Sequence, residues 1–150
     1  MNSILRNVLS CLIGVVLGGG INMAIVVIGP SMIPPPPGVD VTSPEGLSAS
    51  IHLLEPKHFV TPFLAHALGT LAGSLSAFLI AASHKSAFSY LIGTVFLAGG
   101  IAATFMIAAP MWFIILDLVG AYIPMSWIAV KLGTRISKGT IVASASRSDA

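Results

Sequence analysis

Four polar side chains lie inside long apolar stretches of this sequence, and they are its candidates for a functional site. They are Asn22, His66, Thr104 and Asp117. Inserting an aspartate at the centre of a membrane helix costs about 3 kcal/mol, so Asp117 must be paired, protonated or in contact with water. His66 is its natural partner, and Asn22 and Thr104 would complete a hydrogen-bonded network. Such a network is either a clamp that fixes helix register or a site that binds a proton or a ligand.

A second polar group lies just before the stretch that contains His66. His52 and Glu55 are three residues apart, which places them on one helical face, but Pro56 interrupts that helix before His58. The spacing matches no zinc or di-iron signature. We expect these side chains to be interfacial polar residues, and a metal site that also includes His66 is the alternative.

The composition defines the class of protein. Of 150 residues, 55% are hydrophobic and only 8% are charged, whereas soluble domains carry about 25% charged residues. A disordered chain, a nucleic-acid-binding protein and an ordinary cytosolic enzyme are therefore excluded. The single cysteine, Cys11, allows no disulfide within the chain. No nucleotide-binding loop, nucleophile elbow or haem-attachment motif is present, so we expect no cofactor.

Four apolar stretches are about as long as the 20 residues that a membrane-spanning helix requires. They cover residues 8–28, 59–82, 87–109 and 111–130. These stretches predict an all-α membrane protein, with a four-transmembrane-helix bundle over residues 1–132 and a flexible basic tail over 133–150. Pro110 makes the last connection very short, so the third and fourth spans form a hairpin. Gly120 and Pro124 are expected to bend the fourth span.

The four intramembrane polar residues fall at one depth. His66 lies about seven residues inside its span and Asp117 about six, which is roughly 10 Å below the surface at 1.5 Å per residue. Asn22 and Thr104 lie at a similar distance from the same ends of their spans. All four spans thus place one polar side chain in the same layer.

The longest connection is a proline-rich outer loop over residues 29–58, in which Gly29-Pro30 is expected to end the first span. Four successive prolines exclude a helix at 34–37. A short interfacial helix is predicted from about residue 44 to 54, because Ser43 can cap it and Pro44 suits its first position. The fold is therefore a four-span bundle whose outer loop carries one short helix.

Basic residues set the orientation. One end of the predicted bundle carries six of them and the other end only Lys57. This asymmetry predicts that both termini and the turn at 83–86 lie in the cytoplasm. The six are Arg6, Lys85, Lys131, Arg135, Lys138 and Arg147.

Small residues recur every four positions on the spans. This pattern lets membrane helices approach closely, within one chain or between copies. The clearest series are Gly14 and Gly18 in the first span and Ala65, Gly69, Gly73 and Ala77 in the second.

Three segments carry a resemblance to other proteins. IPPPPGVD at 33–40 and SPEGL at 43–47 resemble the outer loop of a broad group of small, uncharacterised four-span bacterial membrane proteins. FLAHALGTLAG at 63–73 resembles the second span of that group, and PMWF at 110–113 resembles its third turn. The resemblance implies the same topology and assigns no catalytic residue.

Three functions remain in competition. The first is a structural or accessory protein that associates with itself or with a larger membrane complex. The second is a small oligomeric transporter or channel that uses His66 and Asp117. The third is an intramembrane metal protein or enzyme. The lipid bilayer is the expected partner in all three, and nucleic acid is not.

Overall fold

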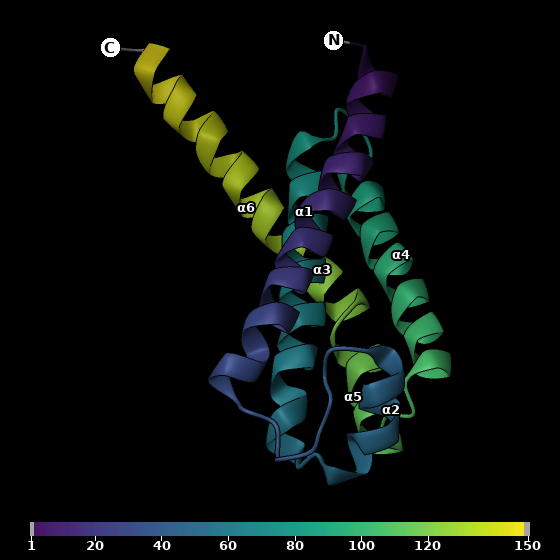
Figure 1. The fold of residues 1–150 in the computed structure, drawn as a ribbon. Coiled ribbons are helices and arrows are strands. Elements are labelled where there is room, and N and C mark those ends of the chain that lie inside the picture. Colours follow the sequence, from purple (N-terminus) through teal and green to yellow (C-terminus); the bar gives the residue numbers. More distant parts are fainter. Residues whose placement is uncertain (1, 149–150) are drawn as a thin grey trace.

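The computed structural model describes residues 2–148, with side chains over residues 2–139, and this part of the chain contains helices and no strands (Figure 1). Four helical segments are long and apolar enough to cross a membrane: Ser3–Met32, Pro56–Ile80, Lys85–Met106 and Met111–Gly139. The predicted all-α four-helix membrane bundle is confirmed. Its long helices are α1 (Ser3–Met32), α3 (Val60–Ile80), α4 (Lys85–Met106) and α6 (Ile123–Ser148).

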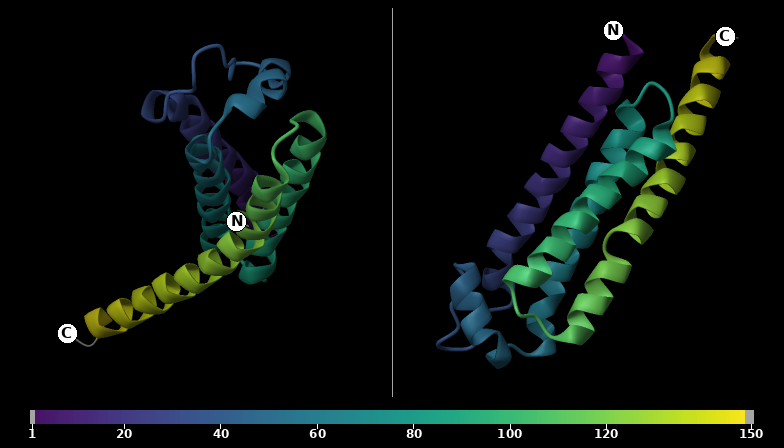
Figure 2. Two further views of the ribbon diagram at one scale, coloured as in Figure 1. Left: turned by 90° about the horizontal axis from the view of Figure 1, so that it is seen from below. Right: turned by 90° about the vertical axis from the view of Figure 1, so that its right-hand side faces the viewer.

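Both ends of the chain lie at one end of the bundle, together with the short turn between α3 and α4 (Figures 1 and 2). The opposite end carries the long loop with the short helix α2 (Pro44–Ser50). We call these the terminal end and the loop end. Even numbers of spans require this arrangement, and it agrees with the predicted topology.

The closest helix pairing joins α1 to α3 through glycines. A Cβ atom added at Gly69 would lie 2.8 Å from the Gly18 carbonyl oxygen, and one at Gly18 would lie 2.6 Å from the Gly69 oxygen. Gly14 and Gly73 form a second reciprocal pair one turn away. Because backbone oxygens cannot move aside as flexible side chains can, only glycine fits at these four positions. The predicted small-residue faces therefore pack within the chain.

Outside its glycine contacts with α3, most of α1 is exposed, and its exposed side chains are apolar. Val16, Met23 and Val27 are between 60% and 70% exposed. In water such a surface would be unfavourable, whereas lipid accepts it without cost. The face is typical of a helix surrounded by acyl chains.

The prediction that Gly29-Pro30 ends the first span was wrong. Pro30 lies inside α1, which continues to Met32, and the Ile33 N–H still donates to the Gly29 carbonyl at 2.9 Å. Proline removes only one backbone donor. Close to a helix end this loss is small, so the last turn survives.

The fourth span consists of two helices, as the predicted bend requires. Helix α5 runs over Met111–Gly120 and α6 begins at Ile123. Ala121 and Tyr122 lie in the break, and both are buried. Pro124 falls in the first turn of α6, where its missing N–H has no intrahelical partner to lose.

The outer loop contains the predicted short helix. Ser43 caps α2 by accepting the Gly46 N–H at 3.0 Å, and a 3₁₀ turn over Ile51–Leu53 follows. Another 3₁₀ turn, Pro56–Phe59, leads into α3. The loop packs through Ile51 against Phe59 and Phe113, which lie at the starts of α3 and α5.

The segment after Leu132 is helical in the described part of the chain, and its flexibility stays a prediction. Residues 133–148 continue α6 as helix, and this end of α6 diverges from α1 (Figure 1). The segment contains no proline, so nothing in its sequence forbids helical dihedrals.

Candidate functional site

His66 on α3 and Asp117 on α5 form a direct contact inside the bundle. The His66 Nδ1 atom lies 2.8 Å from Asp117 Oδ1 and 2.9 Å from Oδ2. Asp117 is only 5% exposed, and 7% of its side chain is accessible against 26% for His66. The carboxylate thus has the partner that its burial in an apolar segment demands.

Tyr122 completes the group. Its hydroxyl donates to Asp117 Oδ2 at 3.0 Å, and its ring stacks on the imidazole with centroids 5.8 Å apart and planes at 28°. Tyr122 itself is 2% exposed. His66, Asp117 and Tyr122 therefore form one closed cluster, which we call the polar trio.

The break between α5 and α6 is what brings Tyr122 to the carboxylate. In an unbroken helix, residues five positions apart point to different sides. Here the chain turns at Ala121, whose N–H still donates to the Asp117 carbonyl at 2.9 Å, and α6 starts afresh at Ile123. The bend therefore builds the site as well as shaping the span.

The imidazole keeps one edge available. A histidine that donates from Nδ1 to a carboxylate has its ring orientation fixed by that bond. Among the described residues, nothing forms a hydrogen bond with His66 Nε2. The ring can therefore offer Nε2 to a bound molecule while Asp117 holds it in place.

A cavity of about 270 Å³ lies at the loop end beside the polar trio, and we call it the loop cavity. His66 and Asp117 line it, together with mostly apolar side chains of the long helices and of the outer loop. The outer loop covers it with Val41, Leu47, Ile51 and Leu54. An apolar cavity with a few convergent polar groups is the usual form of a small-molecule site.

The other two predicted cluster members lie near the trio without bonding to it. The Thr104 hydroxyl donates to the Ile101 carbonyl of its own helix at 2.7 Å, although Thr104 lines the loop cavity. Asn22 lines a second cavity of about 240 Å³, which it shares with His66 and Tyr122. We call this second space the midspan cavity. Of the four predicted cluster residues, the structure joins only His66 and Asp117 directly.

His58 holds the loop to the bundle. It is buried, its Nδ1 accepts the Glu55 N–H at 2.9 Å, and its Nε2 lies 3.2 Å from the Pro34 carbonyl oxygen. Both ring nitrogens are thus engaged with backbone groups, which leaves neither for a metal ion. His58 connects the start of α3 to the proline run.

The remaining candidates for metal binding do not converge. Glu55 forms an exposed ion pair with Lys57 at 3.1 Å, and His52 is exposed on the 3₁₀ turn. Over residues 2–148, no three His, Cys, Asp or Glu side chains lie close enough together to hold a metal ion. The structure brings His66 to Asp117. His58 lines the loop cavity with them, whereas His52 and Glu55 do not.

The sequence did not predict Tyr122 as a site residue, nor the buried hydroxyls of Thr70, Ser74 and Ser126. On α3, His66 is followed at four-residue intervals by Thr70 and Ser74, both buried. Tyr122, in the break before α6, is followed after four residues by Ser126, whose hydroxyl lies 2.9 Å from that of Ser74. The four-residue spacing of these polar residues was a readable signal.

The chain has no significant match among protein-family models, curated proteins or solved structures.

Proposed function

We propose that this protein binds a small, mainly apolar molecule in the loop cavity, with the His66–Asp117 pair as its polar anchor. The observation that carries the proposal is the position of a buried, directly bonded ionisable pair in the wall of an otherwise apolar cavity. Ionisable residues inside membrane spans are rare, and they commonly mark substrate or ion sites.

The chemistry of the site narrows the ligand class. Apolar side chains make up most of the wall, and the imidazole Nε2 has no hydrogen-bond partner among the described residues. A matching ligand is apolar over most of its surface and carries one hydroxyl or amine. A volume of about 270 Å³ lies just below the usual range of drug-sized sites, so the molecule is small.

The orientation in the membrane decides which side the molecule comes from. We propose that the terminal end is cytoplasmic and the loop end is on the outer face of a bacterial inner membrane. Arg6, Lys85 and Lys131 support this orientation, because they lie on helices or turns at the terminal end, whereas the loop end carries only Lys57. The loop cavity then lies toward the outer side of the membrane.

A structural or accessory role is the second candidate, and one observation favours it. Gly20 on α1 and Gly99 on α4 are exposed and have open space where a Cβ would stand. Glycine at exposed positions of membrane helices allows another helix to approach closely. Under this alternative the polar trio is a clamp that fixes the bundle, and a second copy or a larger complex packs on α1 and α4.

Native mass spectrometry of the full chain in lipid nanodiscs separates the two candidates. Binding predicts that the unaltered protein retains a small molecule, that Asp117→Asn loses it, and that Thr94→Val keeps it. Thr94 is a fair control because it is exposed on α4 and bonds only to the Tyr90 carbonyl at 3.0 Å. The same ligand content in all three proteins, or a ligand-free oligomer, would overturn the binding proposal and leave the accessory role.

A further inference from the structure

The buried hydroxyls of the bundle are satisfied with one exception. Ser10 and Ser50 donate to carbonyls of their own helix. The Ser126 hydroxyl donates to the Tyr122 carbonyl at 3.2 Å and lies 2.9 Å from the Ser74 hydroxyl, which therefore donates to it. Within the described residues, the only fully buried side-chain polar atom without a hydrogen-bond partner is Thr70 Oγ1.

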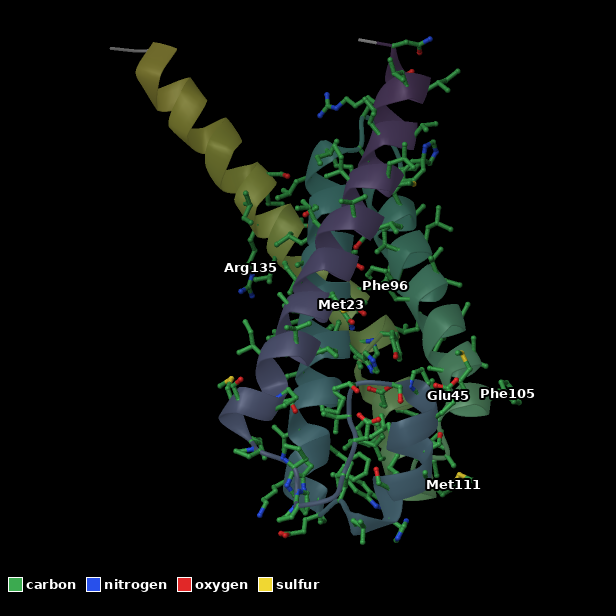
Figure 3. All side chains as sticks on the ribbon, in the orientation of Figure 1. Met23, Glu45, Phe96, Phe105, Met111 and Arg135 are labelled. Carbon is green, nitrogen blue, oxygen red and sulfur yellow. The ribbon has the colours of Figure 1, made fainter. Side chains whose placement is uncertain are left out.

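Thr70 lines the midspan cavity. Thr70 is 1% exposed, and its neighbours around this space include Asn22, His66 and Tyr122. These four residues offer a hydroxyl, an amide, an imidazole and a phenol to one volume. Phe96 of α4 points toward α1 at the same level and closes one side (Figure 3).

We propose that the midspan cavity is a binding site for water, held by the Thr70 hydroxyl together with Asn22 and His66. A buried water needs two to four polar partners and room for about one probe sphere, roughly 15 Å³. The cavity measures about 240 Å³ and supplies four polar residues. A hydroxyl buried without any partner costs free energy in a bilayer, where no other solvent can satisfy it.

The bound water extends the polar trio toward the terminal end. His66 lines both cavities, so water in the midspan cavity touches the same imidazole that lines the loop cavity. One helical turn further along α3, Ser74 begins the hydroxyl pair with Ser126. The pair does not line the midspan cavity, so the water extends the trio by one helical turn, to Thr70. The inference does not rest on the proposed ligand.

Water-edited solid-state NMR of the full chain in lipid bilayers tests the site. In protein with labelled threonine, the Thr70 signal should gain magnetisation from water about twofold faster than the Thr94 signal. Thr94 is the internal control because its hydroxyl is bonded within α4 and its side chain is exposed on the bundle surface. Equal build-up at the two threonines, or transfer to Thr70 from lipid acyl chains, would overturn the proposal.

A pair of variants gives an independent reading. If the Thr70 hydroxyl holds water, Thr70→Val removes a bonded group and lowers the melting temperature relative to Thr94→Val. If the hydroxyl is buried dry, the same change removes an unsatisfied polar atom and raises the melting temperature. The sign of the shift therefore supports or overturns the hydration site, and the NMR measurement needs no variant that must fold.

Discussion

The Nδ1 atom of His66 lies 2.8 Å and 2.9 Å from the two carboxylate oxygens of Asp117, although 51 residues separate the two positions in the chain. Helices α3 and α5 bring these groups together in an environment that would strongly disfavour either one alone. The contact joins the second and fourth spans, so it contributes to the stability of the bundle while it shapes the wall of the loop cavity.

A double-mutant cycle at this pair should show coupling. We expect His66→Ala and Asp117→Ala to be non-additive by about 1 to 2 kcal/mol, at the upper end of measured hydrogen-bond energies between membrane helices. The measurement is reversible unfolding of the purified protein in mixed micelles.

Thr104 supplies the control for that cycle. Its hydroxyl bonds to its own helix, so Thr104→Val combined with Asp117→Ala should be additive within about 0.5 kcal/mol. Additivity of His66→Ala and Asp117→Ala as well would show that the pair contributes no mutual stabilisation.

Glycine packing between α1 and α3 predicts a sharp contrast between two equivalent substitutions. Gly69→Ala should destabilise the protein by about 1 to 3 kcal/mol, because the new Cβ would lie 2.8 Å from the Gly18 oxygen and 2.9 Å from the Asn22 Cβ. Gly20→Ala should be neutral, since nothing lies within 4 Å of the Cβ position there. Thermal unfolding of both variants checks this, and equal effects would contradict the α1–α3 interface.

His58 should control the mobility of the outer loop. Replacing it by leucine removes the link to the Pro34 carbonyl and the acceptor for the Glu55 N–H. We expect amide hydrogen exchange over residues 38–47 to become about five- to tenfold faster, which corresponds to losing one or two modest hydrogen bonds. The matched control is His52→Leu, because His52 is exposed. Unchanged exchange in His58→Leu would mean that other contacts anchor the loop.

Asp40 gives the outer loop a defined acid sensitivity. The Thr42 hydroxyl and the Thr42 N–H both donate to Asp40 Oδ1, at 2.6 Å and 2.8 Å, and these bonds hold the pKa of Asp40 below its ordinary value of 3.8. Since the folded-state pKa is the lower one, these bonds stabilise the loop above about pH 3.8 and are lost as the pH falls through the folded-state pKa.

An NMR titration of the Asp40 carboxyl carbon checks this direction. Thr42→Val removes the hydroxyl and keeps the backbone donor, so the pKa of Asp40 should rise toward 3.8 without reaching it. A pKa unchanged by Thr42→Val would show that the hydroxyl does not stabilise the carboxylate.

The fold followed from the sequence because its main determinants are local. Four apolar stretches of sufficient length, Ser43 before Pro44, and the Gly120–Pro124 interval predicted the spans, the loop helix and the bend. The error came from the end of a helix. Helix α1 continues past Pro30, since a terminal turn tolerates one missing donor.

The site was only partly predictable because it depends on how spans face one another. Depth alone placed Asn22, His66, Thr104 and Asp117 in one layer, but rotation of each helix decides which of them meet. Thr104 turns its hydroxyl to its own backbone, and Tyr122 reaches Asp117 only because the helix breaks between them. Periodicity cannot supply these rotations, whereas it could have shown the series His66, Thr70 and Ser74.

The direct contact between His66 and Asp117 is best tested by solid-state NMR of the full chain in bilayers. The quantity to measure is the distance between His66 Nδ1 and the Asp117 carboxyl carbon. A paired site predicts a protonated Nδ1 in direct dipolar contact with this carbon, and the same contact in the Thr94→Val control. Absence of that contact in the unaltered protein would contradict the paired site and, with it, the anchor of the proposed binding cavity.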